Sequence, residues 1–143
     1  MKISETKDYH QLIDLFIENG LEFSKEKPVE DYAIVKCWKA EENGALIAGC
    51  MLIKREGHYR LEGIAVKKDY RNSKIGSELL KYVLDYIKEH NADSLYLVAK
   101  VPTFYKKHGF KAISREQAPI DVKCFCCPQY QNGCFPEIMK ISI

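Results

Sequence analysis

The sequence has little proline, almost no excess of charge and no long hydrophobic run. It contains five prolines in 143 residues. No apolar stretch approaches the ~20 residues that a membrane-spanning helix needs. The formal net charge of +2 is too small to predict binding to nucleic acid or to a membrane surface. Residues 1–10 are polar and charged, without the apolar core of a signal peptide. We therefore expect a cytoplasmic protein that binds neither nucleic acid nor membrane.

The composition is that of a globular protein, with 46% hydrophobic and 29% charged residues. A chain of this length is about one domain, so we expect a single domain over 1–143. In a reducing cytosol, the six cysteines are expected to be core residues, metal ligands or reactive thiols before disulfides. Cys37 and Cys50 fall in expected strands and are interpreted as core residues.

Hydrophobic periodicity predicts an α+β fold with a mixed sheet. Helices are expected from about residue 8 to Asn19-Gly20, over 75–89 and over 103–108. Asn43-Gly44 predicts a two-residue hairpin turn, because both positions tolerate a positive φ. Residues 21–31 are compatible with a short helix or a loop. Strands are expected over 1–4, 32–41, 45–55, 59–66, 94–99, 110–113 and 137–143.

A basic turn between the strand that ends at Val66 and the following helix is the segment most indicative of chemistry. The unpaired N–H groups and positive dipole of a helix N-terminus suit a phosphate or diphosphate. Nearby cations would add charge-assisted contacts. Taken alone, the turn is equally compatible with a solvated loop that starts a helix. Its cations are Lys67, Lys68, Arg71 and Lys74.

The turn resembles the acetyl-CoA-binding motif of the GNAT superfamily of N-acetyltransferases, which reads Arg/Gln-x-x-Gly-x-Gly/Ala. The sequence here is Arg71-Asn72-Ser73-Lys74-Ile75-Gly76, which matches at Arg71 and Gly76 and departs from glycine at Lys74. A second segment, Phe104-Tyr105-Lys106-Lys107-His108-Gly109-Phe110, resembles the family's Tyr-x-x-x-Gly-Phe element. Two motifs at the expected separation are far more specific than either alone. Only residues 118–136 lack an obvious family counterpart.

The resemblance implies a GNAT-like, mostly antiparallel sheet of six to seven strands flanked by helices. It implies transfer of an acetyl group from acetyl-CoA to a primary amine by direct attack in a ternary complex. The acceptor would be a small amine, an amino acid or a protein amine. Because family members are often dimers, a homodimer is possible.

The resemblance also implies a set of cofactor contacts made by the backbone. Groups at Ile64, Ala65 and Val66 would line the pantetheine arm, and the amide near Val66 would face the thioester oxygen. Lys74 would either hinder close approach of the diphosphate or add a cation to its site. The diphosphate itself would be held by the amides of Arg71, Asn72, Ser73, Lys74, Ile75, Gly76 and Ser77.

Acetyl transfer to an amine needs a base for the amine and a proton for the departing thiolate. Tyr105 suits the second task as a general acid, the role that a tyrosine at this place often has in the family. The alternative is a packing aromatic residue beside Phe104. Glu62 is the candidate base, or else an ordinary surface carboxylate. Regular alternation would place Glu62 on one face with Ile64 and Val66, opposite Leu61, Gly63 and Ala65.

Four cysteines form a cluster in the insertion-like segment at about 118–136. Cys124, Cys126, Cys127 and Cys134 could bind zinc tetrahedrally, although their spacing is not the usual paired one. We favour packing over zinc, with a reactive thiol or a disulfide as further alternatives. The competing functions are therefore an impaired acyl-CoA-binding module and a metal- or redox-responsive one. The histidines are interpreted as surface or turn residues: His10, His58, His90 and His108.

Overall fold

A computed structural model describes residues 1–21, 23–71, 73–99, 102–114 and 137–143. Its strands are β1 (Lys2–Thr6), β2 (Ile34–Glu42), β3 (Ala45–Arg55), β4 (His58–Val66), β5 (Ser94–Ala99), β6 (Lys111–Ala112) and β7 (Glu137–Ser142). Its helices are α1 (Tyr9–Glu18), α2 (Ile75–Glu89) and α3 (Pro102–Lys106), with short 3₁₀ helices η1 (Val29–Tyr32) and η2 (Lys68–Tyr70). The weakly patterned residues before β2 thus contain one 3₁₀ turn, η1.

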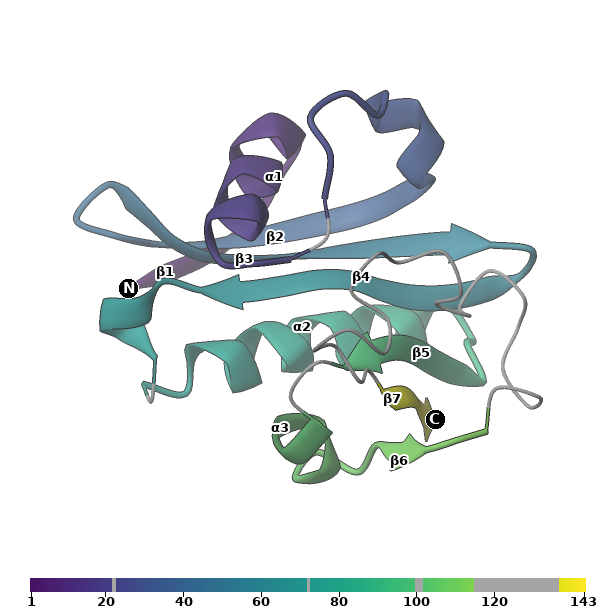
Figure 1. Ribbon diagram of the computed structural model, residues 1–143. Coiled ribbons are helices and arrows are strands. Elements are labelled where there is room, and N and C mark those ends of the chain that lie inside the picture. Colours follow the sequence, from purple (N-terminus) through teal and green to yellow (C-terminus); the bar gives the residue numbers. More distant parts are fainter. Residues whose placement is uncertain (22, 72, 100–101, 115–136) are drawn as a thin grey trace.

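The strands form one seven-stranded sheet in the order β1-β2-β3-β4-β5-β7-β6. Neighbouring strands are antiparallel except for the parallel pair β4 and β5. Helices α1 and α2 lie on opposite faces of the sheet (Figure 1). The predicted α+β class and mixed, mostly antiparallel sheet are confirmed. The single domain over 1–143 stays a prediction.

Local sequence signals account for the first helix and the first hairpin. The Asp8 side chain accepts a hydrogen bond from the Gln11 N–H at 3.2 Å and so caps α1. The turn between β2 and β3 has φ of 53° at Asn43 and 80° at Gly44, as the dipeptide predicted. These two signals fix where α1 begins and how β2 and β3 pair.

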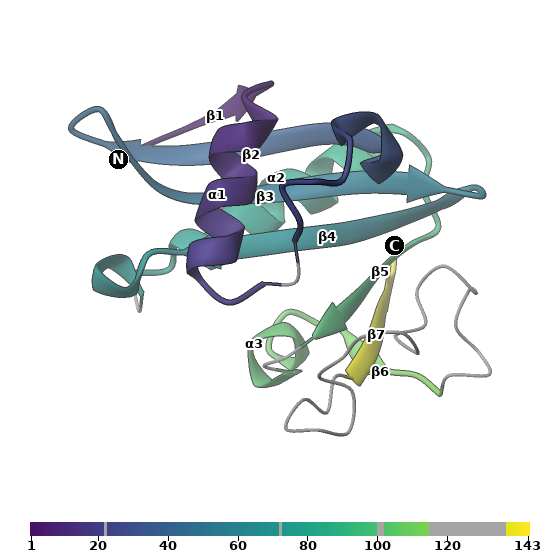
Figure 2. The same cartoon turned by 45° about the horizontal axis from the view of Figure 1, so that its top comes forward.

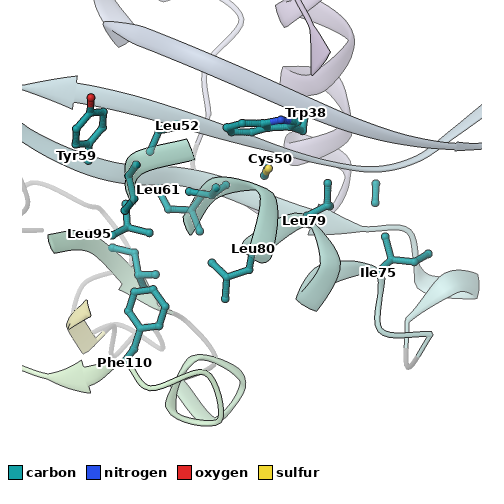
Figure 3. Packing of buried hydrophobic residues seen from close by; sticks show 14 of the residues in the cluster. Trp38, Cys50, Leu52, Tyr59, Leu61, Ile75, Leu79, Leu80, Leu95 and Phe110 are labelled. Carbon is teal, nitrogen blue, oxygen red and sulfur yellow. The ribbon is translucent and has the colours of Figure 1, made fainter. Parts of the chain in front are cut away.

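The buried side chains form a cluster on each face of the sheet. The α2-side core joins Leu79, Val83 and Ile87 to strand residues that include Cys50, and Figure 3 shows several of its members. The α1-side core joins Leu12, Ile13, Leu15 and Phe16 to strand residues that include Cys37. Both cysteines are buried, which confirms their interpretation as core residues. Truncating any one of the large aliphatic residues would cost about 2–5 kcal/mol.

A β-bulge interrupts β4 at Glu62. Met51 pairs with Gly63 and Leu52 pairs with Leu61, so Glu62 is an extra residue opposite β3. The bulge reverses the alternation: Leu61 belongs to the α2-side core, while a Cβ on Gly63 would meet Phe16 and Phe23 of the α1 side. The prediction that Glu62 shares a face with Ile64 and Val66 is therefore wrong. These two residues pack against the α2-side core, whereas Glu62 opens toward the α1 side.

Strands β4 and β5 pair over a short stretch and then part. The register joins Tyr59 to Leu95 and Arg60 to Tyr96, and within the described residues it extends no further. Figure 2 shows β5 turning away from the line of β4 beyond this point. Among the residues that the structure describes, no strand pairs with the β5 side of β4 from Leu61 to Val66. Because β4 leads into the basic turn, this edge runs toward the start of α2.

Candidate active site

The start of α2 is built on a left-handed residue at Lys74. Its φ of 65° and ψ of 12° make it the N-cap of the helix, and its side chain makes no capping hydrogen bond. Glycine adopts this conformation without steric cost, whereas a residue with a Cβ is strained there. The family glycine at this position therefore has a conformational explanation as well as the expected steric one. Lys74 itself is exposed.

Gly76 lies where helix α2 meets α3 and β4. A Cβ at this position would be 3.3 Å from Cζ of Phe104 and 3.8 Å from Cγ2 of Val66. A larger residue would push against the Phe104 ring and separate the helix start from the end of β4. Glycine thus holds the N–H groups of the first turn of α2 close to the unpaired edge of β4.

Arg71 holds the basic turn in place. Its Nε donates to the Val66 carbonyl at 3.0 Å, and its Nη2 donates to Oδ1 of Asn19 at 2.9 Å. The side chain therefore ties the end of β4 to the C-terminal end of α1. In this structure Arg71 therefore shapes the turn, and the Val66 carbonyl accepts the hydrogen bond from Arg71. The Ser73 hydroxyl adds a hydrogen bond to the Tyr70 carbonyl.

Ser77 links the first turn of α2 to the segment after α3. Its Oγ lies 3.0 Å from Nε2 of His108, and the His108 ring packs against Phe104 with centroids 5.0 Å apart. His108 is a turn residue, as expected, but it is half-buried and has a defined partner. The two sequence motifs therefore make direct contact through Ser77 and His108.

Tyr105 is half-buried and packs between aromatic rings. Its ring lies 5.0 Å from that of Phe104 and 5.7 Å from that of Phe110, both edge-on. Burial raises the pKa of the Tyr105 hydroxyl well above its ordinary value, and the nearby Cys50 thiol adds a smaller increase. The phenol consequently carries its proton at every physiological pH.

Glu62 lines a cavity of about 490 Å³ on the α1 side of the sheet. Its Oε1 lies 3.2 Å from Nη2 of Arg60, and their side chains are 18% and 19% exposed, respectively. Such a pair in a partly desolvated site is stronger than an exposed one. The remaining lining residues described are Phe23, Ser24, Lys27, Tyr32 and Arg55.

The structure thus brings the expected cofactor residues together around one strand end, but separates the two catalytic candidates. Tyr105 packs against the α2-side core, while Glu62 faces the cavity on the α1 side. Between them runs β4, at the edge where β5 parts from it. Asn72 lies outside the described residues, as do Cys124, Cys126, Cys127 and Cys134.

The GNAT acetyltransferase domain model matches residues 33–112, which span β2 to β6 and include both motifs. The chain belongs to the GNAT acetyltransferase family. This confirms the predicted family and, with it, the acetyltransferase class. No curated protein matches the sequence.

Solved GNAT structures share this fold at low sequence identity. A GNAT acetyltransferase from Staphylococcus aureus Mu50 has a TM-score of 0.73 at 21% identity, covering 99% of this chain and 98% of that one. A GNAT acetyltransferase from Elizabethkingia anophelis with acetyl-CoA bound has a TM-score of 0.72 at 19% identity, covering 99% and 97%. The N-acetylglutamate synthase of Neisseria gonorrhoeae, complexed with coenzyme A and N-acetylglutamate, has a TM-score of 0.75 at 17% identity. It is matched over 99% of this chain but 35% of its own.

Two negative observations concern only the described part of this GNAT chain. There, no helix is both long and apolar enough to cross a membrane. The same residues contain no group of three or more potential ligands arranged for a metal ion. The cysteine cluster lies outside them, so the preference for packing over zinc binding there stays a prediction. Cytoplasmic location and a homodimer likewise stay predictions.

The sequence analysis missed most of the cavity lining. Lys27 and Tyr32 are far from Glu62 in the sequence and meet it only in the folded sheet, while Arg55 lies across the turn between β3 and β4. One local signal was available, because Arg60 and Glu62 are two charges at strand spacing within an otherwise apolar segment. Charges that share one face of a buried strand indicate a site more strongly than either charge alone.

Proposed function

We propose that this protein transfers the acetyl group of acetyl-CoA to a primary amine by direct attack in a ternary complex. The observation that carries the proposal is the β5 side of β4 from Leu61 to Val66, which has no partner strand in the described part of the chain and leads through the basic turn to the N-terminus of α2. An extended arm can bind along such an edge through backbone hydrogen bonds. The helix N-terminus offers N–H donors to a diphosphate at the other end of that arm.

The residues present fit coenzyme A as the carrier of the acetyl group. Ile64, Ala65 and Val66 lie at the end of β4, and the N–H groups from Ser73 to Ser77 surround the start of α2. Lys74 is exposed at that point and adds a positive charge. Gly76 keeps the helix start close to β4. When bound, acetyl-CoA supplies an activated thioester, and these residues bind and orient it.

Tyr105 is the proposed general acid. Its hydroxyl is protonated at neutral pH, as any tyrosine with a pKa near or above its ordinary value is, and burial raises this pKa further. A protonated phenol can donate to the thiolate that leaves the thioester. Its packing against Phe104 and Phe110 fixes the ring, so that the donor needs little reorganisation during the reaction.

Glu62 is the proposed base. Its carboxylate faces the cavity, and its Oε1 lies 3.2 Å from Nη2 of Arg60. An ammonium that enters the cavity would meet this carboxylate and lose a proton to it, directly or through a water molecule. The bulge at Glu62 aims the side chain into the cavity while Ile64 and Val66 remain along the other face.

Calorimetric titration of acetyl-CoA into the reduced protein, followed by an assay of amine acetylation, tests the proposal. We expect saturable binding near micromolar strength, about −8 kcal/mol. Tyr105→Phe should lower kcat by about 100-fold or more while leaving acetyl-CoA affinity unchanged. Tyr82→Phe, which alters an exposed tyrosine on α2, is the matched control. Binding without turnover would indicate an acyl-CoA-binding module, and no binding at millimolar cofactor would overturn the proposal.

A further inference from the structure

The cavity on the α1 side has more positive than negative charge. Among its described lining residues, Lys27, Arg55 and Arg60 are cations and Glu62 is the one anion. In a partly desolvated pocket, this imbalance attracts a ligand that carries negative charge and disfavours a purely cationic amine. The acceptor of an acetyl group must nevertheless present an amine. The cavity therefore favours an amine that also carries an anionic group.

The two charges in β4 indicate where that anionic group lies relative to the amine. Arg60 and Glu62 are in contact at 3.2 Å, and both side chains are more than four-fifths covered. A zwitterion with its two charges one carbon apart can pair with both at once, its carboxylate on Arg60 and its ammonium on Glu62. The guanidinium offers a planar pair of donors that matches a carboxylate. In such a complex, Arg60 and Glu62 would each form an ion pair with the ligand.

The rest of the cavity provides an apolar wall and further cations. The rings of Phe23 and Tyr32 are stacked with centroids 5.4 Å apart, and the Tyr32 hydroxyl donates to the Ser24 carbonyl at 3.2 Å. Lys27 lies over the Tyr32 ring, with Nζ 4.3 Å from its centroid. Arg55 donates to the Asp31 carbonyl at the end of η1. An acceptor side chain would pack on the aromatic wall and, if acidic, meet Lys27 or Arg55.

We propose that the acceptor is a free α-amino acid, preferably acidic, whose α-carboxylate binds Arg60 while its ammonium faces Glu62. This inference rests on the proposed acetyl transfer and names its substrate class. Glu62 takes one proton from the ammonium and later releases it to solvent. The amine nitrogen then forms a C–N bond with the thioester carbonyl carbon as the C–S bond breaks. Tyr105 gives its proton to the thiolate and regains the second nitrogen proton, which leaves an N-acetyl amino acid and coenzyme A.

Pairs of acceptors that differ only by the α-carboxylate test the proposal. L-glutamate is compared with 4-aminobutanoate, and L-phenylalanine with 2-phenylethylamine, by mass-spectrometric detection of the acetylated product. We expect kcat/KM to be about 100-fold higher for the amino acid of each pair. Glutamate should exceed glutamine, and glutamine should exceed lysine. Calorimetry on protein saturated with coenzyme A should show the same preference without any chemical step.

Variants of Arg60 assign the preference to this residue. Arg60→Gln should reduce the ratio of kcat/KM within each pair to less than about 5-fold, and Arg60→Lys should restore part of it because the charge returns without the planar fork. The ratio of the two kcat/KM values is compared, and not kcat/KM for one acceptor, because loss of Arg60 also affects Glu62. As the proposed base, Glu62 acts on every amine, so its effect cancels in the ratio. Lys54→Gln removes a charge from β3 outside the described lining and should leave the ratio unchanged.

The outcomes separate this inference from the proposed function. Equal or faster acetylation of the amines that lack the carboxylate would overturn the inference and leave acetyl transfer standing. An unchanged ratio in Arg60→Gln would overturn the role of Arg60. Acetyl-CoA binding with no acetylation of any amino acid would also exclude this acceptor class. Failure to bind acetyl-CoA at all would instead remove the proposed function itself.

Discussion

Replacing Lys74 by glycine should stabilise the protein, although it removes a charged side chain from the proposed cofactor site. Lys74 has φ of 65° and caps α2 without a side-chain hydrogen bond. The informative comparison is between Lys74→Gly and Lys74→Ala. Both variants lack the charge, but only alanine keeps the Cβ that is strained in the left-handed conformation.

The expected difference follows from two opposing contributions. Relief of the left-handed strain favours glycine by about 1–2 kcal/mol. The greater freedom of glycine in the unfolded chain opposes this by about 0.4–1 kcal/mol. Glycine is also a better N-cap than alanine, which adds to the first contribution. Lys74→Gly should therefore be more stable than Lys74→Ala by about 1 kcal/mol.

Urea-induced unfolding of the two variants measures this difference. For an m-value of about 2 kcal/mol/M, the midpoint should rise by about 0.5 M in the glycine variant. The melting temperature should rise by about 3–4 °C. Equal stability of the two variants, or a more stable alanine variant, would refute the reasoning that the turn imposes a left-handed residue.

The same variants test how Lys74 affects acetyl-CoA binding. If the lysine contributes only a partly screened charge, both should bind acetyl-CoA about 2–5-fold more weakly than the natural protein. Tighter binding by Lys74→Gly than by the natural protein would instead show that the lysine hinders the diphosphate. Calorimetry at low and high salt separates the charge from the steric effect.

Three further changes test the catalytic, packing and electrostatic arguments. Tyr105→Phe removes the proposed proton donor, so kcat should fall about 100-fold, measured with the amine that the natural protein acetylates fastest. Gly63→Ala would place a Cβ 3.0 Å from Cε2 of Phe23 and 3.2 Å from Cε2 of Phe16, so the free energy of unfolding should fall by about 1–3 kcal/mol. Burial raises the pKa of Cys37 from 9.0 to about 12. Formation of the Cys37 thiolate is therefore disfavoured in the folded state. The resulting contribution to the free energy of unfolding should be fully present below pH 9 and should be lower by about 1.4 kcal/mol at pH 10. In Cys37→Ala, the decrease in the free energy of unfolding between pH 8 and pH 10, measured by urea unfolding, should be smaller by this amount.

Local patterns predicted most of the fold because each is a property of a few adjacent residues. Asn43-Gly44 forms its hairpin turn because both residues adopt a positive φ. The apolar stripe over 75–89 forms α2 because its spacing matches the helix period. The GNAT motifs likewise lie in short segments, and the structure joins them through Ser77 and His108.

The face that Glu62 occupies could not be predicted in this way. Alternation along β4 holds until one extra residue enters the strand, and the pairing with β3 determines where that happens. Gly63 is compatible with a bulge, but the sequence of β4 alone does not specify which residue becomes the extra one. The cavity depends on packing between separate segments of the chain, because Lys27 and Arg55 lie near Glu62 only after η1 and β3 have packed.

The placement of the cavity has a consequence for how acceptor choice can change. Its described lining comes from residues 23–32 and 55–62, whereas the elements proposed to bind acetyl-CoA come from residues 64–77. Substitutions at separate sites without shared partners are close to additive in free energy. A new acceptor preference can therefore arise, by natural divergence or by laboratory selection, through cavity residues such as Lys27 or Arg55 without loss of the acetyl donor. In the proposed reaction, the acceptor and the acetyl donor would thus depend on different segments of the chain.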